Sequence, residues 1–159
     1  MGREQLNYKW ERFGNVAREL RPLVARYRCE IGRDYEPYNP DWNAYYLLDR
    51  NNSVGVWTAR NLNGTLVGFI LWVFNRSLHS TNTIFGLADL IYLAPEWRVG
   101  LLGYGFIKSG KDEASKFCNI IQIETNFLYK NSKGRSFGIL LKRLGMRQRG
   151  EVWDNYGRR

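Results

Sequence analysis

The chain has 159 residues, of which 44% are hydrophobic and 15% aromatic, so a disordered protein is excluded. No apolar run reaches about 18 residues, so a membrane-spanning helix is excluded, and the N-terminus MGREQLNYKWER lacks the apolar region of a signal peptide. The two cysteines, Cys29 and Cys118, are isolated and form no metal-binding pattern. We therefore expect one domain over residues 1–159, without a metal, in the cytoplasm.

The net charge of +9 is concentrated in the last third of the chain. Residues 101–159 hold twelve Lys or Arg and five Asp or Glu, and no acidic residue lies between Glu124 and Glu151. Three interpretations of the basic segment 130–149 stay open: a solvated face, a site for a polyanionic cofactor, or a surface for nucleic acid or an acidic protein. Its basic residues are Lys130, Lys133, Arg135, Lys142, Arg143, Arg147 and Arg149.

The first third of the chain predicts two helices. Apolar residues recur at helical spacing over residues 11–31, and Pro22 is expected to kink or split that helix. Residues 34–40 read as a loop. Asp41 is placed to cap a second helix, on which Trp42, Tyr45 and Tyr46 share a face.

The middle and last thirds predict strands alternating with helices. Strands are expected over 54–59, 65–74 and 84–93, with an Asn63-Gly64 hairpin turn after the first and a polar loop over 75–83. A helix over 101–117, a strand over 119–125, a helix over 132–144 ended by Gly145, and a strand-like tail over 146–157 follow. This order predicts a mixed α/β sheet with crossover helices.

The most informative stretch is 84–106, IFGLADLIYLAPEWRVGLLGYGF, which reads as a buried strand, a glycine-containing loop and a helix start. A loop that enters a helix presents unpaired N–H groups at the positive end of the helix dipole, where phosphate binds. Neither the P-loop pattern GxxxxGK[ST] nor the dinucleotide pattern GxGxxG is present. The phosphate would therefore belong to another class of ligand.

The segment APEWRVGLLGYGF resembles the signature of the Gcn5-related N-acetyltransferase superfamily, R-x-x-G-x-G/A at a helix start. Arg98 and Gly103 match its first and last positions, and Leu101 stands where a glycine is usual, one residue after Gly100. It is also similar to a phage and bacterial subset with the form D-x-x-Y-L-x-P-E-[YW]-R-x-G-L-x-G. Segments 19–23, 39–45, 78–79 and 137–146 resemble other parts of that subset, so the resemblance covers nearly the whole chain.

The resemblance implies a mixed, mostly antiparallel central sheet with N-terminal helices and two crossover helices. It implies an acyl-CoA-dependent N-acyltransferase, with acetyl as the expected acyl group, that transfers it directly to an amine. Main-chain groups around Ile91 and Leu93 would pair with the pantetheine, and the amides of 99–104 would hold the pyrophosphate. The implied cofactor-binding residues are Ile91, Leu93, Arg98, Val99, Gly100, Leu101, Leu102, Gly103 and Tyr104.

Three kinds of residue are candidates for the chemistry. Asp89 is a carboxylate in an apolar strand and shares strand parity with Ile91 and Leu93. We expect it to be buried, and burial would raise its pKa toward the range that suits a general base. A purely structural role stays open. His79 titrates near neutrality in a loop that could border the site, or it is an ordinary loop residue. The superfamily often has a tyrosine acid where this chain has Leu141, and Tyr92, Tyr104 and Tyr129 are candidate substitutes.

The alternative to an enzyme is a catalytically silent protein of the same fold that acts in an assembly such as a virion. The acceptor amine is not identified by the sequence. Its specificity would reside in residues 31–50 and 75–83, which include several tyrosines and tryptophans.

Overall fold

A computed structural model of the chain describes residues 5–31, 39–124 and 136–149. The chain divides into two compact units, residues 1–124 and 125–159, and each is described by itself. The single domain predicted for 1–159 stays a prediction.

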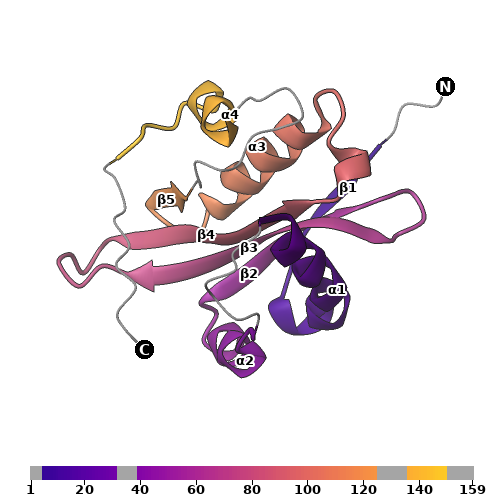
Figure 1. Ribbon diagram of the computed structural model, residues 1–159. Coiled ribbons are helices and arrows are strands. Elements are labelled where there is room, and N and C mark those ends of the chain that lie inside the picture. Colours follow the sequence, from indigo (N-terminus) through magenta and orange to yellow (C-terminus); the bar gives the residue numbers. More distant parts are fainter. Residues whose placement is uncertain (1–4, 32–38, 125–135, 150–159) are drawn as a thin grey trace, which may run out of the picture. The chain divides into compact units, whose positions relative to one another are not determined.

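The first unit is built on a five-stranded sheet in the order β1-β2-β3-β4-β5 (Figure 1). Neighbouring strands are antiparallel except for β4 and β5, which are parallel and are joined through a helix. The strands are β1 (Asn7–Glu11), β2 (Val54–Arg60), β3 (Leu66–Arg76), β4 (Ile84–Leu93) and β5 (Ile120–Ile123). This confirms the predicted mixed, mostly antiparallel sheet.

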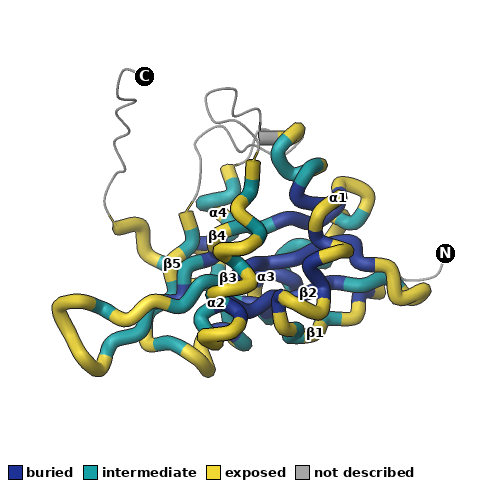
Figure 2. The backbone as a smooth tube through the Cα atoms, turned by 90° about the horizontal axis from the view of Figure 1, so that it is seen from below, coloured by how far each residue is buried: buried dark blue, intermediate teal, exposed yellow. Residues whose placement is uncertain are grey.

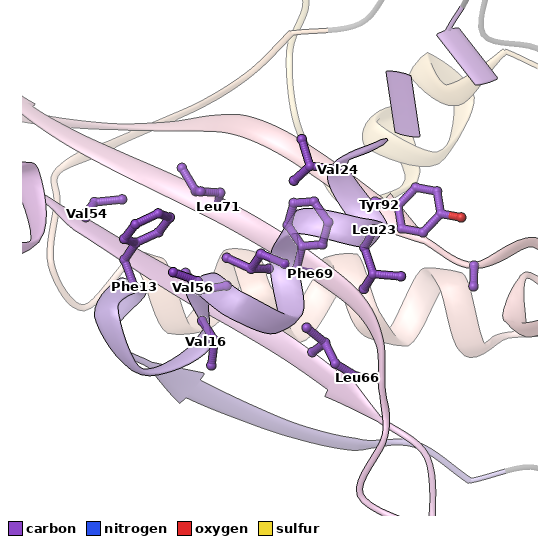
Figure 3. Close-up of a cluster of buried hydrophobic side chains, with 13 residues drawn as sticks. Phe13, Val16, Leu23, Val24, Val54, Val56, Leu66, Phe69, Leu71 and Tyr92 are labelled. Carbon is purple, nitrogen blue, oxygen red and sulfur yellow. The ribbon is translucent and has the colours of Figure 1, made fainter. Parts of the chain in front are cut away.

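Helices cover both faces of this sheet. Helices α1 (Phe13–Ile31) and α2 (Trp42–Arg50) lie on one face, and α3 (Leu102–Ala114) lies on the other (Figure 1). The apolar stripe of α1 packs on alternate residues of the strands, and Figure 3 shows Leu23 and Val24 beside Phe69 and Tyr92. Burial of that stripe is the main stabilising contribution on this face.

The other face requires a glycine for the close approach of α3 to the sheet. A Cβ at Gly110 would lie 2.6 Å from Ile70 Cδ1 and 2.7 Å from Trp57 Cδ1. Figure 2 shows how burial is concentrated in the middle of the sheet, while the turn between β3 and β4 is exposed.

Strand β4 contains a β-bulge that the sequence did not reveal. Leu71 of β3 pairs with Leu90, but the next residue, Trp72, pairs with Ala88, so Asp89 has no partner in the ladder. A bulge of this kind bends the strand and re-aims the extra side chain. The period-2 parity predicted to relate Asp89 to Ile91 and Leu93 is therefore wrong, because the alternation is interrupted at Asp89.

Most predicted elements of the first unit are confirmed, with two exceptions. Strand β4 has its predicted bounds, and the Asp41 carboxylate accepts from the N–H of Ala44 to cap α2, as expected. Strand β1 was missed. Helix α1 is not split, since it runs through Pro22 without interruption.

Within the second unit, the described residues form helix α4 (Phe137–Arg143). Ser136 caps it by accepting from the N–H of Gly138, and Gly145, with φ of 76°, follows its end as predicted. Residues 146–149 form no strand, and the rest of the tail and residues 132–135 of the predicted helix lie outside the described residues. Among the helices that the structure describes, none is long and apolar enough to cross a membrane.

Candidate cofactor and acyl-transfer site

Strands β4 and β5 separate halfway along β4. They pair at four positions, from Phe85↔Ile120 to Ala88↔Ile123, and the ladder ends there. From Asp89 to Leu93, β4 is paired with β3 on one side and has no strand on the other side within residues 5–31, 39–124 and 136–149. The second half of β4 is therefore an open strand edge.

The main-chain groups on this open edge can be assigned from one hydrogen bond. The N–H of Ala94 donates to the carbonyl of Val67, 2.8 Å away, at the end of β3. Because N–H and C=O of one peptide point in opposite directions, the carbonyl of Leu93 points to the open side, and strand alternation places the N–H groups of Leu93 and Ile91 there too. These are the groups predicted to pair with an extended amide-containing ligand.

The loop after β4 presents several free amides. It forms a 3₁₀ turn, η1 (Pro95–Trp97), and reaches α3 through Gly100, whose φ of 55° favours glycine. The amide of Leu102 donates to the carbonyl of Val99. Within the described part of the chain no hydrogen bond involves the amides of Val99, Gly100, Leu101, Gly103 and Tyr104.

The space in front of these amides is open. A Cβ built at Gly100 or at Gly103 would meet no atom within 4 Å, and Leu101 beside them is 81% exposed. Free N–H groups at the start of α3, together with the helix dipole, favour an anion at this position. The residues present therefore fit a pyrophosphate here, with the extended part of an acyl-CoA along the open edge of β4.

The side chain of Arg98 turns away from this space. Its Nε donates to the carbonyl of Leu93, and its Nη2 donates to Glu30 Oε2, 2.7 Å away in the last turn of α1. The guanidinium carbon also lies 5.4 Å from the centre of the Tyr92 ring. One acceptor on the open edge, the Leu93 carbonyl, is thus already engaged by the protein itself.

Asp89 is exposed, so the predicted burial is wrong. The bulge releases its side chain from the ladder, and Tyr45 on α2 donates a hydrogen bond of 2.5 Å to Asp89 Oδ2. Burial, the hydrogen bond to Asp89 and the charge of Asp89 all raise the pKa of Tyr45, so the phenol stays protonated as a donor at neutral pH. Asp89 is therefore a solvent-accessible carboxylate held through one of its oxygens.

Two other candidates for the chemistry are placed differently: Tyr92 lies in the open half of β4 but its side chain is buried, and His79 lies outside that half. Tyr92 is 2% exposed and packs in the core beside Phe69, and burial, followed by the charge of Glu30, raises its pKa. His79 is exposed in the turn before β4, at the opposite end of the strand from Leu93. Neither position supports the predicted role.

Two residues that matter for this geometry were missed. Tyr45 was interpreted only as part of the packing face of α2, and Glu30 was not singled out. In the sequence, Tyr45 is a phenol on a predicted packing face and Glu30 is a carboxylate at a helix end. Neither feature is specific enough to mark a functional residue. The basic residues Lys130, Lys133 and Arg135 lie outside the described residues, and the others belong to the second unit.

Comparison with solved structures identifies the fold. The ribosomal-protein-alanine N-acetyltransferase of Brucella melitensis biovar Abortus 2308 aligns with a TM-score of 0.60 and 20% identity, over 98% of this chain and 99% of that one. A predicted acetyltransferase of Clostridium acetobutylicum, solved with acetyl-CoA, aligns with a TM-score of 0.63 and 17% identity, over 96% of each chain. An aminoglycoside acetyltransferase from an uncultured soil metagenomic sample aligns with a TM-score of 0.70 and 15% identity, over 97% of this chain and 99% of that one.

These likenesses confirm the predicted fold, a mixed, mostly antiparallel sheet with helices on both faces, which the chain shares with these acetyltransferases. No protein-family model and no curated protein sequence matches the chain.

Proposed function

We propose that the chain is an acyl-CoA-dependent N-acyltransferase, with acetyl-CoA as its donor, that passes the acyl group directly to an amine. The observation that carries the proposal is the set of five amides within residues 99–104, all but that of Leu102, that make no hydrogen bond within the described residues, next to the half of β4 that β5 leaves unpaired. A solved structure of the same fold contains acetyl-CoA, and another is a complex with a CoA bisubstrate analogue, which supports this class of donor.

The binding roles follow from the groups that lack partners. The amides of Val99, Gly100, Leu101, Gly103 and Tyr104 would hold the pyrophosphate, and Gly100 and Gly103 leave room for it. The N–H groups of Ile91 and Leu93 on the open edge would donate to the pantetheine carbonyls, as an added strand does. A bound thioester supplies an acyl carbon that a neutral amine would attack, with cleavage of the C–S bond; coenzyme A would leave as a thiolate and take up the proton that the amine nitrogen loses as the amide forms.

The residue that would serve the amine is Asp89. Its Oδ2 accepts from Tyr45, whereas Oδ1 makes no hydrogen bond within the described residues. The free oxygen would receive a proton of the incoming ammonium and leave the amine neutral for attack, while Tyr45 keeps the carboxylate fixed. Asp89 would therefore act as a base because an incoming amine can reach it, and not through the burial that the sequence predicted.

Calorimetry with acetyl-CoA tests the proposal. We expect a one-to-one complex with a dissociation constant in the micromolar range, and weaker binding of acetyl-pantetheine, which lacks the nucleotide and the pyrophosphate. Absence of any heat at millimolar acetyl-CoA would refute the proposal.

A catalytically silent protein of the same fold would differ in turnover rather than in binding. Acetyl-CoA consumption is therefore measured with a panel of monoamines, aminoglycosides and N-terminal peptides. Donor binding without turnover on any of them would favour the silent protein.

A further inference from the structure

We propose that Arg98 is a positioning residue: paired with Glu30 of α1, it braces the loop between β4 and α3 by holding the carbonyl of Leu93, and it does not bind the phosphates itself. The inference rests on the proposed function, because the loop that it braces is the proposed pyrophosphate site. It differs from the resemblance, which placed Arg98 among the cofactor-binding residues.

The first step of the argument is the set of partners that Arg98 already has. Its Nε and Nη2 donate to two different acceptors, the Leu93 carbonyl and the Glu30 carboxylate, the latter at 2.7 Å. Its backbone N–H donates to the carbonyl of Pro95. One residue thus ties the end of β4, the 3₁₀ turn and α1 together, and a planar guanidinium is suited to hold two acceptors at fixed angles.

The second step is direction. The guanidinium lies near the ring of Tyr92, and Tyr92 belongs to the hydrophobic cluster on the α1 face of the sheet. Helix α3, whose first-turn amides form the proposed phosphate site, covers the opposite face (Figure 1). Reaching phosphate would require Arg98 to leave the Leu93 carbonyl, Glu30 and the ring together.

The third step is a second contact of the same kind. Arg26 of α1 also lies near the Tyr92 ring, with its guanidinium carbon 5.9 Å from the ring centre. Its Nη2 pairs with Glu96 Oε2 of the 3₁₀ turn, 3.5 Å away. Side chains of this second pair are 50% and 57% exposed, whereas those of Arg98 and Glu30 are 42% and 29% exposed. Helix α1 therefore holds the loop at two points, and the Arg98 contact is the shorter and less exposed one.

Removing the charge of Glu30 distinguishes a brace from a phosphate ligand, because the two roles predict opposite signs. If Arg98 is a brace, Glu30→Gln loosens the loop and weakens acetyl-CoA binding, by about two- to fivefold for a partly exposed pair. If Arg98 is a phosphate ligand, the same change frees it and tightens binding. Glu96→Gln is the matched comparison, since it removes one negative charge from the longer and more exposed of the two contacts between α1 and the loop, and we expect a smaller loss of affinity than in Glu30→Gln.

Two further variants test whether the guanidinium group of Arg98 must hold both acceptors at once. Arg98→Lys keeps the charge but cannot hold both acceptors, so we expect it to weaken binding about as much as Arg98→Gln, by roughly five- to twentyfold. In the double variant Arg98→Gln with Glu30→Gln, the second change should add no further loss, because the two residues act as one unit. Near-wild-type binding by Arg98→Lys, or tighter binding by Glu30→Gln, would overturn the inference.

Hydrogen exchange of the ligand-free protein separates this inference from the proposed function. The hydrogen-bonded amides of Trp97, Arg98 and Leu102 should exchange faster in Glu30→Gln than in the wild type and in Glu96→Gln, whether or not acetyl-CoA binds. Unchanged exchange would overturn the brace alone, whereas a wild-type protein that binds no acetyl-CoA would overturn the proposed function alone.

Discussion

The two halves of β4 have different neighbours. From Phe85 to Ala88 the strand has a partner on both sides, and Gly86 there is so tightly enclosed that a Cβ would lie 2.7 Å from Cys118 Sγ. In the half from Asp89 to Leu93, β3 is the one partner strand among the described residues, and the bulge exposes a carboxylate. One strand therefore divides into a half that stabilises the sheet and a half along which we propose that the acyl donor and the amine bind.

The difference teaches how one sheet can carry both tasks. Unpaired N–H groups are tolerated on an edge because water or a ligand can satisfy them. Changes in the paired half should therefore lower stability and spare binding, and changes around the open half should do the reverse. The predictions below test this separation, beginning with the largest expected effect.

The largest effect is expected from Gly103→Glu beside the open half. The new carboxylate would occupy the space in front of the free amides and repel phosphate, so acetyl-CoA affinity should fall by at least about 100-fold. The thermal midpoint should stay equal or rise, since glycine is a poor helix residue and an acidic group suits a helix start. Calorimetry and thermal unfolding measure the two quantities.

Gly103→Gln is the control for this prediction, because it has the same size without the charge. It should lose affinity less severely and keep its stability. A Gly103→Glu protein that unfolds more easily, or that binds acetyl-CoA as the wild type does, would contradict the separation between the two halves.

The next effect is expected from Asp89→Asn in the open half. An amide cannot accept the proton of the amine, so kcat/KM for the acceptor should fall about 100-fold or more. Donor affinity should change less than about twofold, and stability little, because Asp89 is exposed. Steady-state kinetics with the best acceptor of the panel measure the loss.

Two neighbouring tyrosines provide the control for Asp89. Tyr45→Phe removes the hydrogen bond to Asp89 Oδ2 and should lower kcat about three- to tenfold. Tyr46→Phe removes the hydroxyl of the next residue and should leave kcat unchanged. Equal effects of the two variants would show that Tyr45 acts only through packing.

A smaller effect, on stability alone, is expected from Gly86→Ala in the paired half. The added methyl would meet Cys118 Sγ at 2.7 Å and Phe74 Cε1 at 3.2 Å, so the free energy of unfolding should fall by about 1–3 kcal/mol. Acetyl-CoA affinity, measured well below the unfolding temperature, should stay within about twofold. Urea denaturation measures the loss, with Gly103→Ala as the matched comparison because its added methyl meets open space. A loss of acetyl-CoA affinity in Gly86→Ala would contradict the prediction that this change affects stability alone.

The smallest effect is expected from Glu19→Gln, away from the open half of β4, and it is a pH-dependent change in the free energy of unfolding. The hydrogen bond and charge of Arg60 on β2 lower the pKa of Glu19 in the folded protein. A lowered pKa contributes stability above the unfolded value, and that contribution is lost as the pH falls through the folded value. Glu19→Gln should therefore reduce the free energy of unfolding by about 0.2–1 kcal/mol at pH 7, and the difference should shrink as the pH falls to 3.

Denaturation curves at both pH values measure this difference. Donor affinity at pH 7 should not change, since Arg60 lies on the paired side. A difference that persists undiminished at pH 3 would show that Glu19 acts by packing rather than through its charge.

Elements with local signals could be predicted from the sequence. The bounds of β4, the capping of α2 by Asp41 and the glycine after α4 each follow from residues close to them in the sequence. Strand β1 has only five residues, and it is stabilised by pairing with β2, so its short alternation of Tyr8 and Trp10 was not distinctive.

The free amides after β4 follow from the loop pattern, because a glycine-containing helix start is a local feature, while their role in binding a cofactor stays a prediction. The bulge at Asp89 depends on the register between β3 and β4, and the partners of Asp89 and Arg98 lie 44 and 68 residues away along the chain. Contacts at such separations are set by tertiary packing, and single-sequence patterns do not contain them.

The bulge also has a consequence for the length of the chain. Leu71 pairs with Leu90 and Trp72 with Ala88, so excision of Asp89 would leave an uninterrupted ladder in which every other side chain keeps its face. At this point the polypeptide is one residue longer than its sheet requires. A protein shortened by Asp89 should thus fold and keep its affinity for acetyl-CoA, and it should lose turnover if Asp89 is the proposed base.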